Sequence, residues 1–117
     1  MNRLEIVITT ENAVCVMRLT GELDVATAPS LRDEIANAVA KGGPILVSLE
    51  KVEFLDSRGI GALVAGTRQA RESGTDVAVV IVSQSQRHSI EVLKLEAFLT
   101  IRASEAEALR ALTGASE

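Results

Sequence analysis

The stretch FLDSRGIGAL places Ser57 directly after an acid, Asp56, and shortly before two glycines, Gly59 and Gly61. A serine hydroxyl has two main chemical uses. It attacks a substrate when a neighbouring base removes its proton, or it receives a phosphoryl group from a kinase. The first use requires a base, and the only histidine of the chain is His88. The two uses therefore predict different surroundings for Ser57.

A serine hydrolase does not fit this sequence. A nucleophile elbow reads G-x-S-x-G, whereas the chain reads L-D-S-R-G around Ser57 and lacks the first glycine. His88 lies in SQSQRHSI, near the start of another expected helix, and nothing in the sequence brings it to Ser57. We interpret His88 as a solvated or helix-capping residue, and we expect no catalytic triad and no enzymatic activity.

Cofactor and metal sites are also not indicated. GIGALVAG has Val64 where a dinucleotide fingerprint needs its third glycine, and no G-K-[ST] motif occurs. A phospho-accepting Asp56 of a receiver domain would need an acidic pair after the first strand and a lysine after the last, and neither is present. Cys15 is the only cysteine, so we expect a buried, inert residue and no multi-thiolate zinc site. We predict no cofactor and no metal.

The position of Ser57 has a structural and a functional interpretation. Asp56 or Ser57 would serve as the N-cap of a helix, a role worth about 1 kcal/mol. Taken alone, this explains the pair. Gly59 and Gly61, however, fall in the first helical turn, where each costs about 0.8–1 kcal/mol relative to alanine. The sequence therefore suggests that something is gained by keeping side chains away from Ser57.

The expected helix at 57–72 carries two stripes. We expect the larger side chains to face a sheet: Ile60, Leu63, Val64 and Thr67. The other stripe consists of small residues: Gly59, Ala62, Gly66 and Ala70. Either a neighbouring helix of the same chain covers this second stripe, or a partner protein lies on it, and the sequence leaves both alternatives open.

Composition limits the class of protein. The 117 residues correspond to one domain, 1–117, with a core at about 4–112. Two phenylalanines and no tyrosine or tryptophan predict an aliphatic core without stacking surfaces for single-stranded nucleic acid. A net charge of −4 argues against nucleic-acid and anionic-membrane partners. Without a signal-like start or a long apolar run, we expect a cytoplasmic protein that does not insert into a membrane.

Hydrophobic periodicity predicts the elements that position Ser57. We expect strands at 4–10 and 13–20 paired as a hairpin, a connector at 21–24, a helix from 27 to the glycines at 42–43, a strand at 45–49, a helix at 57–72, a strand at 77–82, a helix at 85–95, an extended piece at 99–102 and a helix at 105–112. The strand–helix–strand order implies right-handed parallel crossovers. The predicted fold is a small α/β domain with a mixed sheet, an antiparallel hairpin followed by parallel strands, and about four helices.

Two motifs together resemble a known family. LTGELDVATAPSLRDEI, followed by FLDSRGIGALVAGTRQARESG, is similar to the STAS domain of bacterial anti-sigma factor antagonists, typified by G-E-L-D and D-S-[ST]-G-[LI]-G. The likeness spans the chain from about residue 4 to 112. It implies that Ser57 is the phosphorylated serine. It also implies a partner surface formed by the following residues: Asp24, Thr27, Asp56, Ser57, Arg58, Gly59, Gly61 and Ala62.

The resemblance also implies a mechanism. The unphosphorylated protein would bind an anti-sigma factor that is also a serine kinase and so release a sigma factor for transcription. Phosphorylation of Ser57 would end the binding, and a serine phosphatase would restore it. Two alternatives come from other classes: a STAS subunit of a membrane transport assembly without a phosphate cycle, and, less supported, a nucleotide-binding or catalytic α/β protein.

The sequence departs from the family pattern at two places. Arg58 stands where the family has a small Ser or Thr, and a cation in a first turn opposes the helix dipole. Arg58 would either pair with a phosphate on Ser57 or change which kinase docks. In LKLEAFLTI, Glu96 or Ala97 stands where the family often has a glycine after its third helix, so the turn there is uncertain in the prediction.

Overall fold

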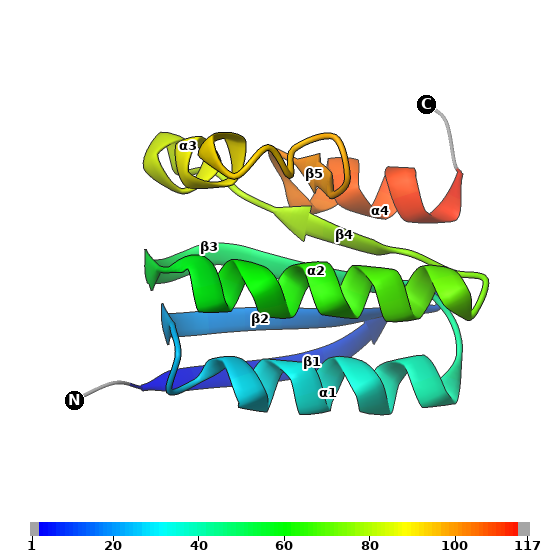
Figure 1. The fold of residues 1–117 in the computed structure, drawn as a ribbon. Helices are drawn as coiled ribbons and strands as arrows, with labels where there is room; N and C mark the ends of the chain where they lie inside the picture. Colours follow the sequence, from blue (N-terminus) through cyan, green and yellow to red (C-terminus); the bar gives the residue numbers. More distant parts are fainter. Residues whose placement is uncertain (1–2, 115–117) are drawn as a thin grey trace.

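The computed structural model describes residues 3–114 as a five-stranded sheet with four helices (Figure 1). The elements are β1 (Leu4–Glu11), β2 (Val14–Leu23), α1 (Ala28–Lys41), β3 (Ile45–Leu55), α2 (Ser57–Glu72), β4 (Val77–Val80), α3 (Gln84–Val92), β5 (Thr100–Arg102) and α4 (Glu105–Thr113). The strand order follows the sequence, with β1 and β2 antiparallel and all later neighbours parallel. The predicted mixed α/β fold is confirmed.

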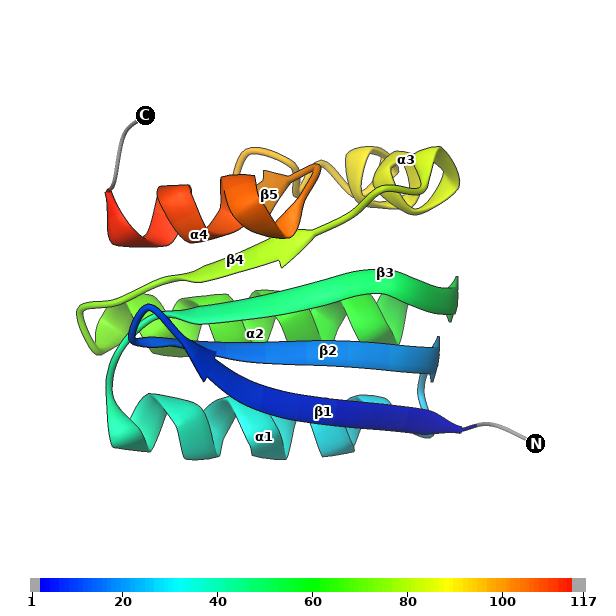
Figure 2. The same ribbon diagram turned by 180° about the vertical axis from the view of Figure 1, so that it is seen from behind.

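The helices cover the two faces of the sheet unequally. α1 and α2 lie side by side on one face (Figure 1), and α4 lies on the opposite face against β3 and β4 (Figure 2). The larger aliphatic core fills the space under α1 and α2, and a smaller cluster lies under α4. Within residues 3–114, no helix has the length and apolar character required to cross a membrane.

Strand lengths differ from the prediction at one end of the sheet. Residues 21–23, predicted as part of a connector, belong to β2 and pair with β3, which runs to Leu55 instead of ending at residue 49. The charged side chains of Glu50, Lys51 and Glu53 hide this extension in the sequence, because they are exposed in a part of β3 that β4 no longer accompanies. β4 in turn ends at Val80, where the chain turns toward α3.

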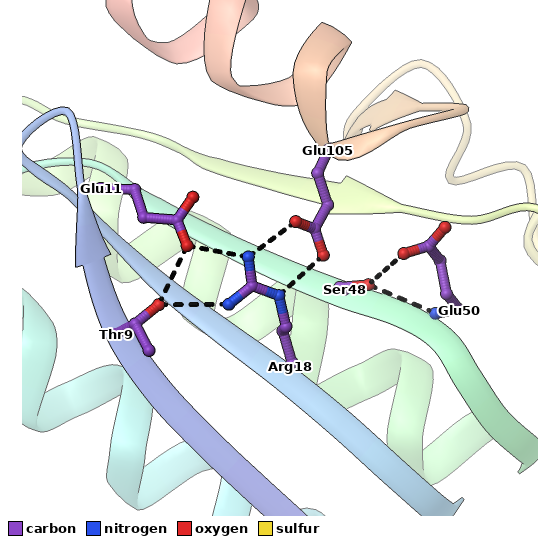
Figure 3. Close-up of polar contacts among 6 residues, drawn as sticks. All are labelled: Thr9, Glu11, Arg18, Ser48, Glu50 and Glu105. Atoms are coloured by element: carbon purple, nitrogen blue, oxygen red, sulfur yellow. Dashed lines mark hydrogen bonds and ion pairs between the residues drawn. The ribbon is translucent and has the colours of Figure 1, made fainter.

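An ion cluster joins the N-terminal hairpin to α4 on the open half of the sheet (Figure 3). Arg18 on β2 contacts Glu11 Oε2 at 2.8 Å and Glu105 Oε1 at 2.8 Å. The Arg18 guanidinium lowers the pKa of the Glu11 carboxyl from its ordinary value, mainly by hydrogen bonding. Cys15, on the same strand, is half-buried, and burial raises the pKa of its thiol. Both features belong to the scaffold.

The small stripe of α2 is covered by the chain itself. A Cβ on Gly66 would lie 2.7 Å from Ile35 Cδ1 on α1, and Ala62 and Ala70 have no exposed surface. Of the two alternatives for this stripe, packing against a neighbouring helix is therefore the correct one. The larger stripe faces the sheet as predicted, although Val64 is only partly buried.

The turn that ends α3 has its left-handed residue at Lys94. Leu95 N donates to Ile90 O at 3.1 Å and Lys94 N donates to Glu91 O at 2.9 Å, which is the Schellman pattern of helix termination. The left-handed position of this motif is Lys94, with φ of 60°. The turn therefore carries a left-handed residue with a Cβ at Lys94, whereas neither Glu96 nor Ala97 has a positive φ that would favour glycine.

Lys94→Gly is expected to raise the free energy of unfolding by about 1 kcal/mol, because a left-handed residue with a Cβ carries a cost of roughly 1–2 kcal/mol, partly offset by the greater unfolded-state entropy of glycine. Urea denaturation measures the change. Lys94→Ala keeps the Cβ and serves as the control, with no comparable gain. Equal stability of the glycine and alanine variants would contradict the assigned strain.

Candidate functional site

Asp56, at the junction of β3 and α2, is the N-cap of α2. Its Oδ1 accepts from Gly59 N at 2.9 Å, and its backbone N–H donates to Leu23 O at 3.2 Å, which fixes the helix start beside the end of β2. This resolves the choice between Asp56 and Ser57 as the cap. Ser57 is exposed, and among residues 3–114 its hydroxyl has no hydrogen-bond partner. The hydroxyl is therefore accessible and not needed to hold the fold.

The loop between β2 and α1 is shaped by Asp24, which is only 4% exposed. Its Oδ1 accepts from Ala26 N at 3.0 Å and Thr27 N at 3.1 Å, and Thr27 Oγ1 donates to Glu22 O at 2.8 Å. Thr27 is half-buried and precedes α1 without a capping side-chain bond. Because the polar groups are turned inward, the loop presents the exposed side chain of Val25 instead.

The two glycines of α2 have different surroundings. A Cβ on Gly59 would lie 2.5 Å from Leu23 O and 2.8 Å from Leu23 Cγ, so Gly59 allows the first turn of α2 to pack against the end of β2. A Cβ on Gly61 would meet no atom within 4 Å. The prediction that both glycines leave room for a partner therefore needs correction: Gly59 serves internal packing, and only Gly61 borders open space.

The predicted partner surface thus divides into two groups. Asp24, Gly59 and Ala62 are buried, so these residues offer almost no surface to a partner. The remaining predicted residues are exposed or partly exposed: Thr27, Asp56, Ser57, Arg58 and Gly61. Arg58 makes no hydrogen bond or ion pair with any other described residue, so its guanidinium is free at the surface.

A depression of about 260 Å³ lies between the start of α2 and α3. It is lined by Leu55, Asp56, Ser57, Ile60, His88, Ser89, Val92 and Leu93. The tertiary structure therefore brings His88 to the same depression as Ser57, contrary to the sequence interpretation. No hydrogen bond joins the Ser57 and His88 side chains. Nothing in the sequence signals this meeting.

A second depression, of about 220 Å³, adjoins the first and shares Leu55 and Ser89 with it. Phe54 lines it, and Gln86 Nε2 donates to Val52 O at 2.7 Å, on the edge that β4 leaves uncovered. α3 therefore replaces the missing strand neighbour of β3. Within residues 3–114, no three His, Cys, Asp or Glu side chains form a group that could hold a metal ion.

Exposed apolar side chains gather at this end of the molecule. Most of the large apolar residues with substantial exposure lie near the carboxyl ends of β2, β3 and β4 or at the end of α3: Val25, Phe54, Val82, Val92 and Leu93. Ser57 starts α2 at the same end. Of these residues, Val92 and Leu93 line the same depression as Ser57. Single exposed apolar residues are ordinary, but a contiguous exposed apolar patch is typical of a protein interaction surface.

The fold described above, a mixed five-stranded sheet with four helices, is that of a STAS domain. The STAS domain family matches residues 5–108, and the chain belongs to this family. It is 30% identical over 95 residues to the anti-sigma-B factor antagonist of Staphylococcus aureus (strain NCTC 8325 / PS 47), covering 80% of this chain and 87% of that protein. It is 27% identical over 111 residues to the anti-sigma F factor antagonist of Paenibacillus polymyxa, covering 93% and 95%.

Solved structures agree with these relatives. The crystal structure of an anti-sigma factor antagonist from Mycobacterium paratuberculosis matches with a TM-score of 0.87 and 27% identity over 95% of each chain. The likeness to STAS-domain anti-sigma factor antagonists that the two sequence motifs predicted is thereby confirmed.

Proposed function

We propose that this protein is an anti-sigma factor antagonist whose unphosphorylated form binds an anti-sigma factor with serine kinase activity and so releases a sigma factor for transcription. The observation that carries the proposal is the free, exposed hydroxyl of Ser57 in a depression that the exposed apolar side chains of Val92 and Leu93 also line. The names of the similar proteins support it. The protein acts by binding rather than by catalysis.

The docking surface comprises the start of α2, the loop between β2 and α1, and the exposed side of α3. Val25, Phe54 and Val92 supply apolar contact area, and Arg58 supplies a free charge. Ser57 lines a depression together with Val92, so a partner that covers this depression also covers the Ser57 hydroxyl. The kinase that modifies Ser57 and the partner that leaves after modification are then the same protein.

Phosphorylation of Ser57 switches the surface without refolding the domain. The phosphoryl group adds a charge of about −1.5 to −2 at neutral pH. Because the Ser57 hydroxyl makes no hydrogen bond within the described chain, the fold loses none when the group is attached. At a closed interface the added charge costs several kcal/mol if it meets like charge or is left unpaired. A serine phosphatase removes the group and restores binding.

The site of action follows from these partners. The kinase, the sigma factor and the phosphatase operate in the cytoplasm, and the protein needs neither nucleic acid nor membrane insertion of its own. The Asp56-Ser57 pair of the family motif and the names of the similar proteins favour the phosphorylation switch over the alternative, a STAS subunit of a membrane transport assembly.

Incubation with ATP and a candidate anti-sigma factor kinase tests the proposal by mass spectrometry. We expect one added phosphoryl group, located on Ser57, and none on Ser57→Ala. Ser85→Ala, which removes another exposed serine close to the same depressions, is the matched control and should accept the group as the unaltered protein does. Copurification with a membrane transporter and no phosphoryl transfer would overturn the proposal.

A further inference from the structure

We propose that the phosphoryl group on Ser57 does not extend into solvent but lies in the depression between α2 and α3, where His88 holds it. The inference rests on the proposed function in taking Ser57 as the phosphorylated residue. It assigns a role to His88, which the sequence interpretation treated as a solvated residue, and it gives α3 a part in the switch.

The geometry that carries the inference is the shared lining of one depression. Ser57 borders it from the first turn of α2, and His88 borders it from α3. With a volume of about 260 Å³ it is only a few side chains across. Both side chains are exposed, and neither is hydrogen bonded to another described residue, so both are free to turn toward it.

Donor chemistry selects His88 within this depression. A phosphoryl group brings three strong acceptor oxygens and needs donors or cations. The other polar groups of the lining are poor partners: Asp56 is an acid whose Oδ1 already accepts from Gly59 N, and Ser89 Oγ donates to Ser85 O at 3.1 Å. The imidazole of His88 is the remaining polar side chain of the lining that can donate, apart from Ser57 itself.

The charged groups around the depression either favour or oppose a phosphoryl group inside it. Arg87 and Glu91 flank His88 on α3, and both border a neighbouring depression with it. From the side of α2, Asp56 opposes a phosphate and Arg58 favours it. The apolar floor, formed by Leu55, Ile60, Val92 and Leu93, would penalise an unpaired anion but strengthens a paired one. Pairing with the imidazole N–H of His88 therefore decides whether the phosphoryl group enters.

The consequence concerns how phosphorylation ends partner binding. A phosphoryl group in the depression covers the apolar floor that a partner would otherwise contact. The switch then acts by occupying part of the docking surface in addition to placing charge on it. Without His88 the group remains in solvent, and only the charge effect persists.

The test uses protein in which phosphoserine is installed at position 57 by genetic code expansion, so that no kinase is required. The readout is the ³¹P chemical shift as a function of pH, which follows the second ionisation of the phosphate near pH 6. A hydrogen-bond donor beside the phosphate favours the dianion. We expect the midpoint to lie lower with His88 present than in His88→Gln by about half a pH unit, a modest value for an exposed pair.

Arg87→Gln is the matched control, because it removes a cation from the same helix that does not line the depression. It should shift the midpoint much less than His88→Gln. A second readout is the imidazole signal of the only histidine, which should move when phosphoserine replaces Ser57. An identical phosphate midpoint in the unaltered protein and His88→Gln would overturn the inference.

The outcome is separable from that of the proposed function. A shifted midpoint in a protein that no anti-sigma kinase binds would support the pairing and contradict the function. If a kinase modifies Ser57 but the phosphate midpoint is the same with and without His88, the result would support the function and contradict the pairing.

Discussion

Replacing Ser57 by glutamate is expected to weaken binding to the anti-sigma factor by about 100-fold or more, whereas Ser57→Ala binds as tightly as the unmodified protein. A factor of 100 corresponds to about 2.8 kcal/mol, which is within the cost of a charge placed unpaired in a closed interface. Alanine adds no charge, and the hydroxyl it removes has no hydrogen-bond partner among residues 3–114. Isothermal titration calorimetry with the anti-sigma factor measures both affinities.

Ser73→Glu is the matched control for this prediction. Ser73 is exposed and lies at the opposite end of the same helix, so it receives the same charge away from the proposed surface (Figure 1). The affinity of the Ser73→Glu variant for the anti-sigma factor should stay within about twofold of that of the unaltered protein, because exposed charges separated by more than a Debye length are largely screened. If glutamate at 57 and at 73 had equal effects, the docking surface proposed at the start of α2 would be wrong.

Gly59→Ala is expected to lower the free energy of unfolding by about 2–3 kcal/mol, which is at the upper end of typical overpacking costs. The added methyl group would lie 2.5 Å from Leu23 O and 2.8 Å from Leu23 Cγ. The Leu23 carbonyl has little freedom to move away from the new methyl group, because its oxygen also accepts a hydrogen bond from Asp56 N. The helix start must therefore move away from β2.

Gly61→Ala provides the comparison, since it adds the same group to the same helix, two residues further on. A Cβ there meets nothing within 4 Å, so the substitution should stabilise the protein by about 0.5–1 kcal/mol through helix propensity. Urea denaturation of both variants measures the two changes. Effects of the same sign would contradict the assigned difference between the glycines.

Local patterns were sufficient for most of the fold. The predicted hairpin, the helix at 57–72 and the final helix correspond to β1 and β2, α2 and α4 because alternation, helical spacing and capping residues act between near neighbours. Ser57 could be singled out for the same reason: the acid before it and the glycines after it are contiguous in the chain. The family motifs are equally local.

Other features depended on contacts between distant segments. The extension of β3 to Leu55 follows from its pairing with β2. That pairing contains two register shifts, which the alternation of apolar and polar residues does not predict. The burial of Asp24 and the contact between Gly59 and Leu23 arise only when the end of β2 meets the start of α2. Only these contacts show that Asp24 and Gly59 are buried residues and not part of the exposed surface.

The sequence by itself singled out Ser57 and the elements that carry it, because those depend on residues adjacent along the chain. Only the tertiary structure decided what surrounds that hydroxyl. Parallel pairing brings the carboxyl ends of β2 and β3 to one edge, and α3 follows β4 to that same edge. His88 reaches the depression beside Ser57 through this route, and no local pattern encodes it.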